Sequence, residues 1–340
     1  MALNYHHATL SLLHLLFLSL HLSTAALVKQ QPLTLKYHNG ALLKGKVTVN
    51  LIWYGKFTPA QRAIIVDFIQ SLGSTQAPPP SAAAWWRTTE KYHGGASTLV
   101  VGNQILHEDY PFGKILKNSH IVGLGSRPNN QVDSINVVLT ADDVAVEGFC
   151  MRCGSHGYAR RGKARFAYIW VGNSATQCPG QCAWPFHQPL YGPQTSPLVA
   201  PNGDVGVDGM IINLATLLAG TVTNPYSDGY FQGPPTAPLE AVSACTGKFG
   251  SGAYPGYPGK VLVDKSTDAS YNANGVNGRK FLLPAMWDPE SSACSTLVIC
   301  ILQGGKLRIL RHQVGKKALA RDHQIMEQRY GIVKLYGGEF

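Results

Sequence analysis

The chain has 340 residues, of which 45% are hydrophobic and 14% are charged, and its formal net charge is +10. This apolar content is enough for one large core or two small ones, and it excludes disorder over the whole chain. The 36 glycines and 21 prolines predict long irregular connections rather than a helix bundle. The sequence has neither a heptad run nor an internal repeat, which excludes a coiled coil and a solenoid.

The positive charge is divided between a mildly basic body and a basic tail. Residues 299–340 hold eight Lys or Arg and three Asp or Glu, a net charge of +5, and the rest of the chain supplies the other +5. We find no Lys/Arg stripe interleaved with aromatic residues in the body, and therefore expect no nucleic-acid partner. A mild positive charge is suited to adsorption on a polyanion.

The first 26 residues are typical of a secretory signal peptide. They contain no Asp, Glu, Lys or Arg, and a leucine-rich run at 10–22 is followed by Ser23, Thr24, Ala25 and Ala26. The alternative is a membrane anchor, but the run is shorter than the ~20 residues that a span needs. We expect cleavage after Ala25 or Ala26, export to the extracellular space, and no membrane association afterwards.

Six cysteines lie in the body and a seventh, Cys300, lies in the tail. The six are Cys150, Cys153, Cys178, Cys182, Cys245 and Cys294. An oxidising compartment would pair them. We expect a disulfide between Cys245 and Cys294, because the other four are close in sequence and can pair among themselves. The alternative is a zinc site built from the C-x2-C and C-x3-C pairs, whose spacing alone is permissive.

The expected elements alternate between strand and helix in the first half of the chain. A strand at 47–53 precedes a helix at 59–73, for which Thr58 and Gln61 form a capping box. The other expected elements are a helix at 81–92, strands at 98–101, 135–140 and 166–171, a helix at 210–223 and a strand at 280–283. The stretches 178–202 and 230–259 are dense in Gly, Pro and aromatic residues. These features predict a single α/β domain with a mixed sheet, packed helices and a loop-rich, disulfide-stabilised C-terminal part.

The chain has none of the common catalytic signatures, such as G-x-S-x-G, a P-loop or H-E-x-x-H. The helix at 210–223 nevertheless has two different faces. Met210, Leu214 and Leu217 belong to the apolar face. The opposite stripe is Asn213, Thr216, Gly220 and Thr223. Thr216 and Gly220 have the i, i+4 spacing of zincin metal ligands, and Leu217 stands where the general-base Glu would be. The simpler interpretation is a core helix with a seam of small residues.

Resemblance to zincin-like secreted peptidases makes this pattern more specific. The run at 214–225, followed by Gly229 and Tyr230, resembles the peptidase segment in which His-Glu leads into a Val-Thr-Asp-Pro turn. The residues around the metal-binding positions are similar, but the metal-binding residues themselves are absent. The resemblance implies a zincin-like core that is a pseudo-enzyme, with degenerate metal positions at Asn213, Thr216, Leu217 and Gly220, and with no metal or cofactor.

A second resemblance extends from residue 35 to residue 298. The motifs are YHNGALLKGKVTVNLIWYGKF, FAYIWVGNSATQCPGQCAWPFHQPLYGPQ, APNGDVGVDGMIINLATLLAGTVTNPY, GYFQGPPTAPLEA and NGRKFLLPAMWDPESSACSTLV. They resemble the plant EXORDIUM and EXORDIUM-like proteins, the phosphate-induced protein family. The resemblance implies a cell-wall or apoplastic protein linked to brassinosteroid-promoted growth and carbon status, and it supplies no catalytic residues.

The resemblance divides the chain into three parts. A signal peptide at 1–26 is followed by an EXORDIUM-like domain at 27–298 and an atypical basic extension at 299–340. Family members stop at the CSTLV ending, so we interpret the extension as arising from a retained intron or gene-model error, with a real appendage as the alternative.

Other residues offer alternative sites. His156 and His187, with Asp204 or Asp208, could form a metal site, although each histidine is more simply a loop or core residue. Five tryptophans could present stacking surfaces for sugars, although tryptophan usually fills cores: Trp53, Trp85, Trp86, Trp170 and Trp184.

The sequence therefore predicts a secreted, non-enzymatic wall protein that acts by binding. The expected partner is an acidic wall polysaccharide or a cell-surface receptor. The alternatives are a carbohydrate-binding protein of another kind, a zinc peptidase with unusual ligands, and a wall glycosidase, which would need two opposed carboxylates.

Overall fold

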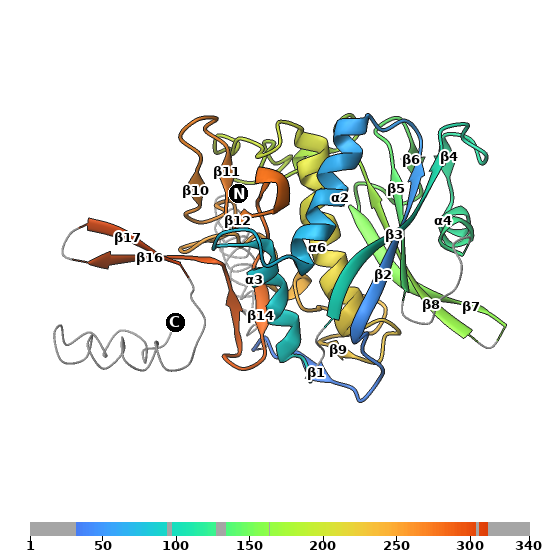
Figure 1. Cartoon of the computed structure of the whole chain (residues 1–340), viewed down its shortest axis with the longest axis horizontal. Helices are drawn as coiled ribbons and strands as arrows, with labels where there is room; N and C mark the ends of the chain where they lie inside the picture. The colour runs from blue at the N-terminus through green and yellow to red at the C-terminus, as the bar shows by residue number, and fades with distance from the viewer. Residues whose placement is uncertain (1–31, 94–96, 127–133, 163, 304–305, 312–340) are drawn as a thin grey trace, which may run out of the picture. The chain divides into compact units, whose positions relative to one another are not determined.

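The computed structural model describes residues 32–93, 97–126, 134–162, 164–303 and 306–311. The expected signal peptide lies outside these residues, as does most of the expected extension. From Thr34 onward the chain forms one unit, built around a five-stranded sheet (Figure 1).

The sheet is mixed, as the sequence predicts. Its strands are β2 (Gly45–Tyr54), β3 (Ser97–His107), β5 (Ser134–Thr140), β7 (Gly154–Arg161) and β8 (Ala164–Gly172). Their order is β3-β2-β5-β8-β7, and the first four are parallel, whereas β7 runs antiparallel to β8 at the edge. β2 lies between β3 and β5 and is buried on both faces in its second half, as expected of a strand between parallel neighbours covered by helices.

Helices cover both faces of this sheet. α2 (Pro59–Gly73) and α6 (Val205–Thr223) lie side by side on one face (Figure 1). α4 (Asn118–Gly125) packs on the other face, where the Nδ2 group of Asn136 donates to the Gly125 carbonyl over 2.7 Å. Within the described residues, α6 is the helix long and apolar enough to cross a membrane. Its burial between the sheet and the loops accounts for that apolar character.

The predicted capping of α2 is present. Thr58 Oγ1 accepts from the Gln61 backbone amide, and Gln61 Oε1 accepts from the Thr58 amide. This reciprocal pair satisfies two amides that the first turn leaves without helical partners. The apolar stripe then packs against the sheet; its buried members are Ile64, Ile65, Phe68, Ile69 and Leu72.

Several expected boundaries were wrong. The helix at 81–92 divides into α3 (Ala82–Trp86) and a 3₁₀ segment, η1 (Arg87–Lys91). β3 runs on to His107 because the side-chain carbonyl of Asn50 accepts from the Asn103 amide, which allows pairing with β2 to continue past an irregularity. Strand β7 and helix α4 were not predicted.

The C-terminal part is rich in loops, as predicted, with short elements between them. The helical pieces are α5 (Pro179–Cys182), η2 (Ser243–Cys245) and η3 (Val276–Gly278). The short antiparallel pairs are β1 (Lys36–Tyr37) with β9 (Tyr230–Phe231), β10 (Leu262–Val263) with β11 (Ser270–Tyr271), β12 (Ala273–Asn274) with β13 (Lys280–Phe281), β14 (Met286–Asp288) with β15 (Ala293–Ser295), and β16 (Val298–Gln303) with β17 (Lys306–Arg311). A parallel pair joins β4 (Ile115–Leu116) to β6 (Ala145–Val146).

Three disulfides hold this part of the chain. Cys245 is bonded to Cys294, as expected, and the other four cysteines pair among themselves. The two remaining bonds are Cys150–Cys178 and Cys153–Cys182. The thiolate zinc site considered as an alternative is therefore wrong, because all four sulfurs of its two pairs are in disulfides.

We predict that replacing both Cys245 and Cys294 by alanine lowers the free energy of unfolding by about 4 kcal/mol, because the chain-entropy model assigns that value to a loop of this length. The bond closes a sequence separation of 49 residues. Chemical denaturation of the variant and the oxidised wild type checks the value, and equal stabilities would contradict it.

Candidate functional site

Helix α6 carries the four positions that resemble a degenerate metal site. It begins after Asp204, whose Oδ1 accepts from the Val207 amide over 2.9 Å. An Asp at this position is a strong N-cap, and its negative charge interacts favourably with the positive end of the helix dipole. The helix then packs across β7, β8 and α5. Its small and polar residues therefore face protein rather than an open cleft.

Two of the four positions, Asn213 and Thr216, are half-buried and form hydrogen bonds with backbone carbonyls. The Nδ2 group of Asn213 donates to the carbonyls of Cys182 and Gly209, each over 2.9 Å. The Thr216 hydroxyl donates to the Ile212 carbonyl over 2.9 Å. Asn213 thus connects the last residue of α5 to α6, a structural role that its position in the sequence alone did not indicate.

The other two positions differ from the expected faces. Leu217, expected on the buried face, is half-buried, whereas Gly220 and Thr223, expected on the opposite stripe, are buried. A Cβ placed on Gly220 would lie 2.8 Å from Glu240 Oε2 and 3.2 Å from His156 Nε2. Met210 and Leu214 are buried as expected. The predicted faces were wrong at the other positions because this part of α6 is covered both by β7, which carries His156, and by the loop that carries Glu240.

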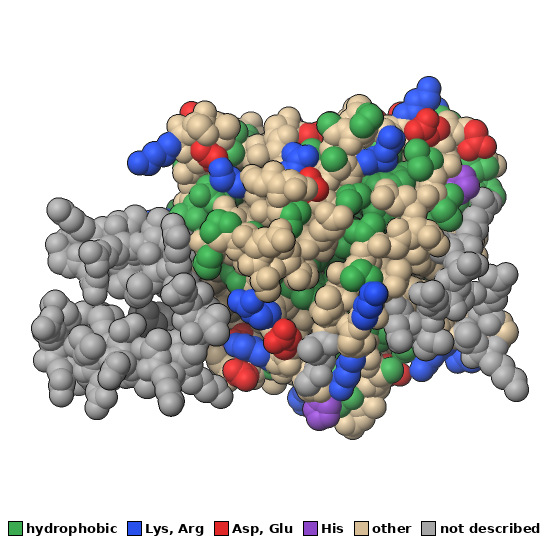
Figure 2. All heavy atoms as spheres, in the orientation of Figure 1, with side chains coloured by type: hydrophobic (Ala, Val, Ile, Leu, Met, Phe, Trp, Pro, Cys, Tyr) green, Lys and Arg blue, Asp and Glu red, His purple; other side chains and the backbone are tan. Residues whose placement is uncertain are grey.

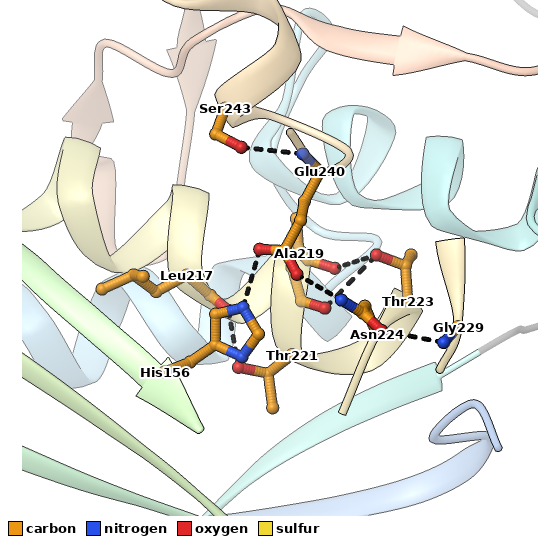
Figure 3. A network of polar contacts seen from close by, with 10 residues as sticks. His156, Leu217, Ala219, Thr221, Thr223, Asn224, Gly229, Glu240 and Ser243 are labelled. Carbon is orange, nitrogen blue, oxygen red and sulfur yellow. Dashed lines mark hydrogen bonds and ion pairs between the residues drawn. The ribbon is translucent and has the colours of Figure 1, made fainter. Parts of the chain in front are cut away.

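The side chains that fill the space beside Gly220 form a polar network, shown in Figure 3. His156 Nε2 lies 2.7 Å from Glu240 Oε2, and the Nδ2 group of Asn224 donates to Glu240 Oε1 over 2.7 Å. Asn224 Oδ1 in turn accepts from the Gly229 amide over 2.8 Å. The side chains of His156 and Glu240 are only 12% and 10% exposed. We call this set the His156–Glu240 network.

The network joins three segments that are distant in sequence. His156 comes from β7, Asn224 ends α6, and Glu240 precedes η2, where its amide donates to Ser243 Oγ. A buried carboxylate is costly unless it is paired and hydrogen-bonded. Glu240 meets this requirement, because both of its oxygens have a partner. The arrangement therefore fixes the end of α6 against the edge strand.

The network supplies only part of what a zincin needs. A catalytic zinc site takes three protein ligands and an open position for water. Within the described residues, no group of three or more His, Cys, Asp or Glu is arranged to hold a metal ion. Sequence reasoning raised His156 for a different site, and Glu240 was not identified at all, because an isolated Glu in a proline-rich loop has no distinguishing pattern.

The alternative metal site of two histidines and an aspartate was wrong. His156 pairs with Glu240, whereas His187 is exposed and contacts the Gln188 carbonyl. Asp204 caps the start of α6, which is sixteen residues from Gly220, roughly 24 Å at the rise of a helix. Asp208 is buried and accepts two hydrogen bonds from Asn202.

The tryptophans divide clearly into core and surface. Four of them, Trp53, Trp85, Trp86 and Trp170, are at most 3% exposed and belong to the core. Trp184 is different, because it is half-buried and lines a cavity of about 190 Å³ that we call the Trp184 cavity. The lining residues are Trp184, Pro185, His187, Pro189, Thr195, Ser196, Pro197, Leu198, Tyr257 and Pro258.

The Trp184 cavity is positioned by the elements already described. Trp184 lies two residues after Cys182. Cys182 is joined by a disulfide to Cys153, directly before β7, and its carbonyl accepts a hydrogen bond from Asn213 of α6. A Cβ on Gly209 of α6 would lie 2.8 Å from the Ala183 Cα, so glycine permits this close approach. The ring of Tyr257 on the other wall lies 5.1 Å from that of Tyr254, which is 62% exposed. Trp184 and Tyr257 therefore line the cavity with aromatic side chains, and the disulfide and the hydrogen bond of Cys182 hold the Trp184 segment in place.

Comparisons with known proteins identify the family. Residues 35–297 match the model described as the phosphate-induced protein 1 conserved region. The chain is 67% identical to Protein EXORDIUM-like 2 of Arabidopsis thaliana over 307 residues, covering 88% of this chain and 100% of that protein. It is 59% identical to Protein PHOSPHATE-INDUCED 1 of Nicotiana tabacum, covering 81% and 92%, and 58% identical to Protein EXORDIUM of Arabidopsis thaliana, covering 84% and 97%.

The structure is that of a disulfide-bonded α/β protein. The chain belongs to the EXORDIUM and phosphate-induced protein family. No solved structure matches it.

Burial raises the pKa of Asp208 to about 7, although hydrogen bonds from Asn202 oppose the shift. Because the folded pKa lies above the unfolded value of 3.8, the folded state binds the proton more tightly. Stability should therefore fall as pH rises from about 4 to about 7.

We predict that Asp208→Asn makes the free energy of unfolding less dependent on pH across this interval. Denaturation of the variant and wild type at several pH values measures the two slopes. Asn202→Asp serves as a comparison, because a second carboxyl beside Asp208 should steepen the dependence. Identical slopes for Asp208→Asn and wild type would contradict the prediction.

Proposed function

We propose that this chain is a secreted protein of the apoplast and cell wall that acts by binding wall polysaccharide rather than by catalysis. The observation that carries the proposal is the Trp184 cavity, which is lined by the one half-buried tryptophan of the five considered, while the other four are in the core. Aromatic faces pack against the apolar faces of sugar rings, and such surfaces combine apolar contact with a polar edge.

The size and lining of the cavity support this function. A volume of about 190 Å³ is below the range of drug-sized ligand sites and is suited to a single ring of a longer chain. The hydroxyls of Thr195 and Ser196 and the imidazole of His187 supply hydrogen-bonding groups at its edge. Two tyrosines close in sequence to the lining residues are exposed to solvent: Tyr191 is 80% exposed and Tyr254 is 62% exposed.

We further propose that the core is zincin-like and that the protein is a pseudo-enzyme. The support is the packing of α6 on the sheet and the filling of the space at Gly220 by His156 and Glu240. Resemblance to the family supports a role in brassinosteroid-linked growth and carbon-status responses, in which the partner would be an acidic wall polysaccharide or a cell-surface receptor.

We predict that Trp184→Ala weakens binding to soluble, methyl-esterified polygalacturonate by roughly tenfold, the loss expected when one large apolar contact is removed. Isothermal titration measures the affinity. Ile115→Ala is the matched control, because Ile115 is 78% exposed and lies in β4. Trp184→Phe should retain part of the affinity, and equal binding by Trp184→Ala and Ile115→Ala would contradict the assignment.

Secretion has its own test. We predict that the mature protein begins at Ala26 or Leu27, because the leucine-rich run and the small residues after it direct export and cleavage. N-terminal sequencing of protein recovered from the medium of expressing plant cells checks the position. Protein that stays in the cells with Met1 retained would refute it.

A further inference from the structure

The hairpin formed by β7 and β8 carries an unusual concentration of positive charge. Residues 158–166 read YARRGKARF, with four basic residues and no acidic one. The expectation that the body has no basic stretch interleaved with aromatic residues was therefore wrong for this segment, because its basic residues stand between Tyr158 and Phe166. The hairpin extends beyond the rest of the sheet, as Figure 1 shows.

The two described arginines at the tip face one another. Arg160 and Arg165 are direct partners across the two strands, and like charges in this position destabilise a hairpin. Arg160 is exposed, and it has no ion-pair partner among the residues that the structure describes. A local rule of sheet stability is therefore broken at a surface position, and such positions are often functional.

Aromatic rings hold one of these arginines in place. The guanidinium of Arg165 lies 4.0 Å from the ring centroid of Tyr226 and 6.0 Å from that of Tyr158. The two rings are packed edge to face at 5.5 Å. Stacking of this kind orients a guanidinium while its N–H groups remain available. Tyr158 is itself 40% exposed and lies on the same side of β7 as Arg160.

The nearby negative charge neutralises this pair only partly. Arg165 Nη1 lies 3.9 Å from Asp228 Oδ2, which is too long for a hydrogen bond, and both side chains are more than one-third exposed. The contrast with other cations is clear. Arg279 donates to Asp67 over 2.9 Å, and Lys280 and Lys91 are each in contact with an aspartate. The β7–β8 tip, meaning Tyr158, Arg160, Arg165 and Tyr226, therefore has positive charge that its own acids leave uncompensated.

We propose that the β7–β8 tip binds the carboxylate groups of an acidic polysaccharide of the hexuronate type. A carboxylate accepts two hydrogen bonds from a guanidinium, and one placed between Arg160 and Arg165 would relieve their repulsion. The exposed face of Tyr158 would contact the sugar ring that bears the carboxylate. The inference rests on the proposed polysaccharide function, and it adds a second contact surface and the residues that would recognise the charge of the polymer.

The experiment compares polygalacturonate with its fully methyl-esterified form, which has the same sugar chain without the charge. Arg160→Gln should weaken binding to polygalacturonate about tenfold, the effect of losing a charge-assisted hydrogen bond. Binding to the esterified form should be unchanged. Added salt should reduce the difference between the two probes.

Two further variants separate binding from structural effects. Lys56→Gln is the matched control, because Lys56 is an exposed cation two residues after β2, at the opposite end of the sheet. It should change the affinity less than twofold. Arg160→Lys keeps the charge but loses the planar fork, and should be intermediate. Because Arg160→Gln removes a like-charge repulsion, its melting temperature should equal or exceed that of the wild type.

The outcomes distinguish this inference from the proposed function. If the wild type binds both probes equally, or if Arg160→Gln behaves as Lys56→Gln does, the inference is overturned and the proposed function stands. If the wild type binds neither probe, the proposed function fails. If vesicles containing phosphatidylserine bind in an Arg160-dependent way while polygalacturonate does not, the partner is a membrane surface and the inference is also overturned. Self-association of Arg160→Gln with intact binding would show that the arginines only protect the sheet edge.

Discussion

The burial of α6 on nearly all sides is the constraint on which the rest of the structure depends. Fifteen of its nineteen residues are buried, so it needs a covering of loops as well as the sheet. Two glycines allow the loops to pack closely on α6. The backbone of Ala183 approaches Gly209, and the side chain of Glu240 approaches Gly220. Close packing against these glycines places the Trp184 cavity at one end of the helix and the His156–Glu240 network at the other.

The loop-rich C-terminal part needs substitutes for regular secondary structure. Buried backbone groups must be hydrogen-bonded even where no helix or strand supplies the partners. Asn272 illustrates the solution: its Nδ2 group donates to the carbonyls of Phe249 and Leu283, and its Oδ1 accepts from the Leu283 amide. The Cys245–Cys294 bond joins the same region covalently. Together they hold loops firmly enough to serve as one wall of a cavity and as a cover for α6.

Strand β7 connects the buried and the exposed polar chemistry of the molecule. Alternation along the strand puts His156, Tyr158 and Arg160 on one side. The side chain of His156 is largely enclosed near the end of α6, Tyr158 packs edge to face on Tyr226, and Arg160 is exposed at the tip. Glu240 lies within hydrogen-bond distance of the imidazole in the interior, whereas Arg160 at the tip has no acidic partner among the described residues. One end of β7 thus contributes to packing in the interior, and the other end carries an arginine of the proposed binding site.

Local sequence determined the elements whose signals are contained within a few residues. The capping box of α2, the apolar strands β2, β5 and β8, and the disulfide-rich nature of the C-terminal part all followed from composition and periodicity. Only the tertiary structure decided which side of α6 faces protein, because the loops that cover it are distant in sequence. It also decided that Trp184 alone of the five tryptophans is half-buried rather than in the core, and that Glu240 meets His156 across 84 residues. The pairing of Arg160 with Arg165 is different, because Arg161 and Ala164 pair directly across residues 162–163, and a loop of that length sets the register of a hairpin. That pairing was a local signal that sequence reasoning missed, whereas the contacts of Trp184 and Glu240 depend on loops that only folding brings together.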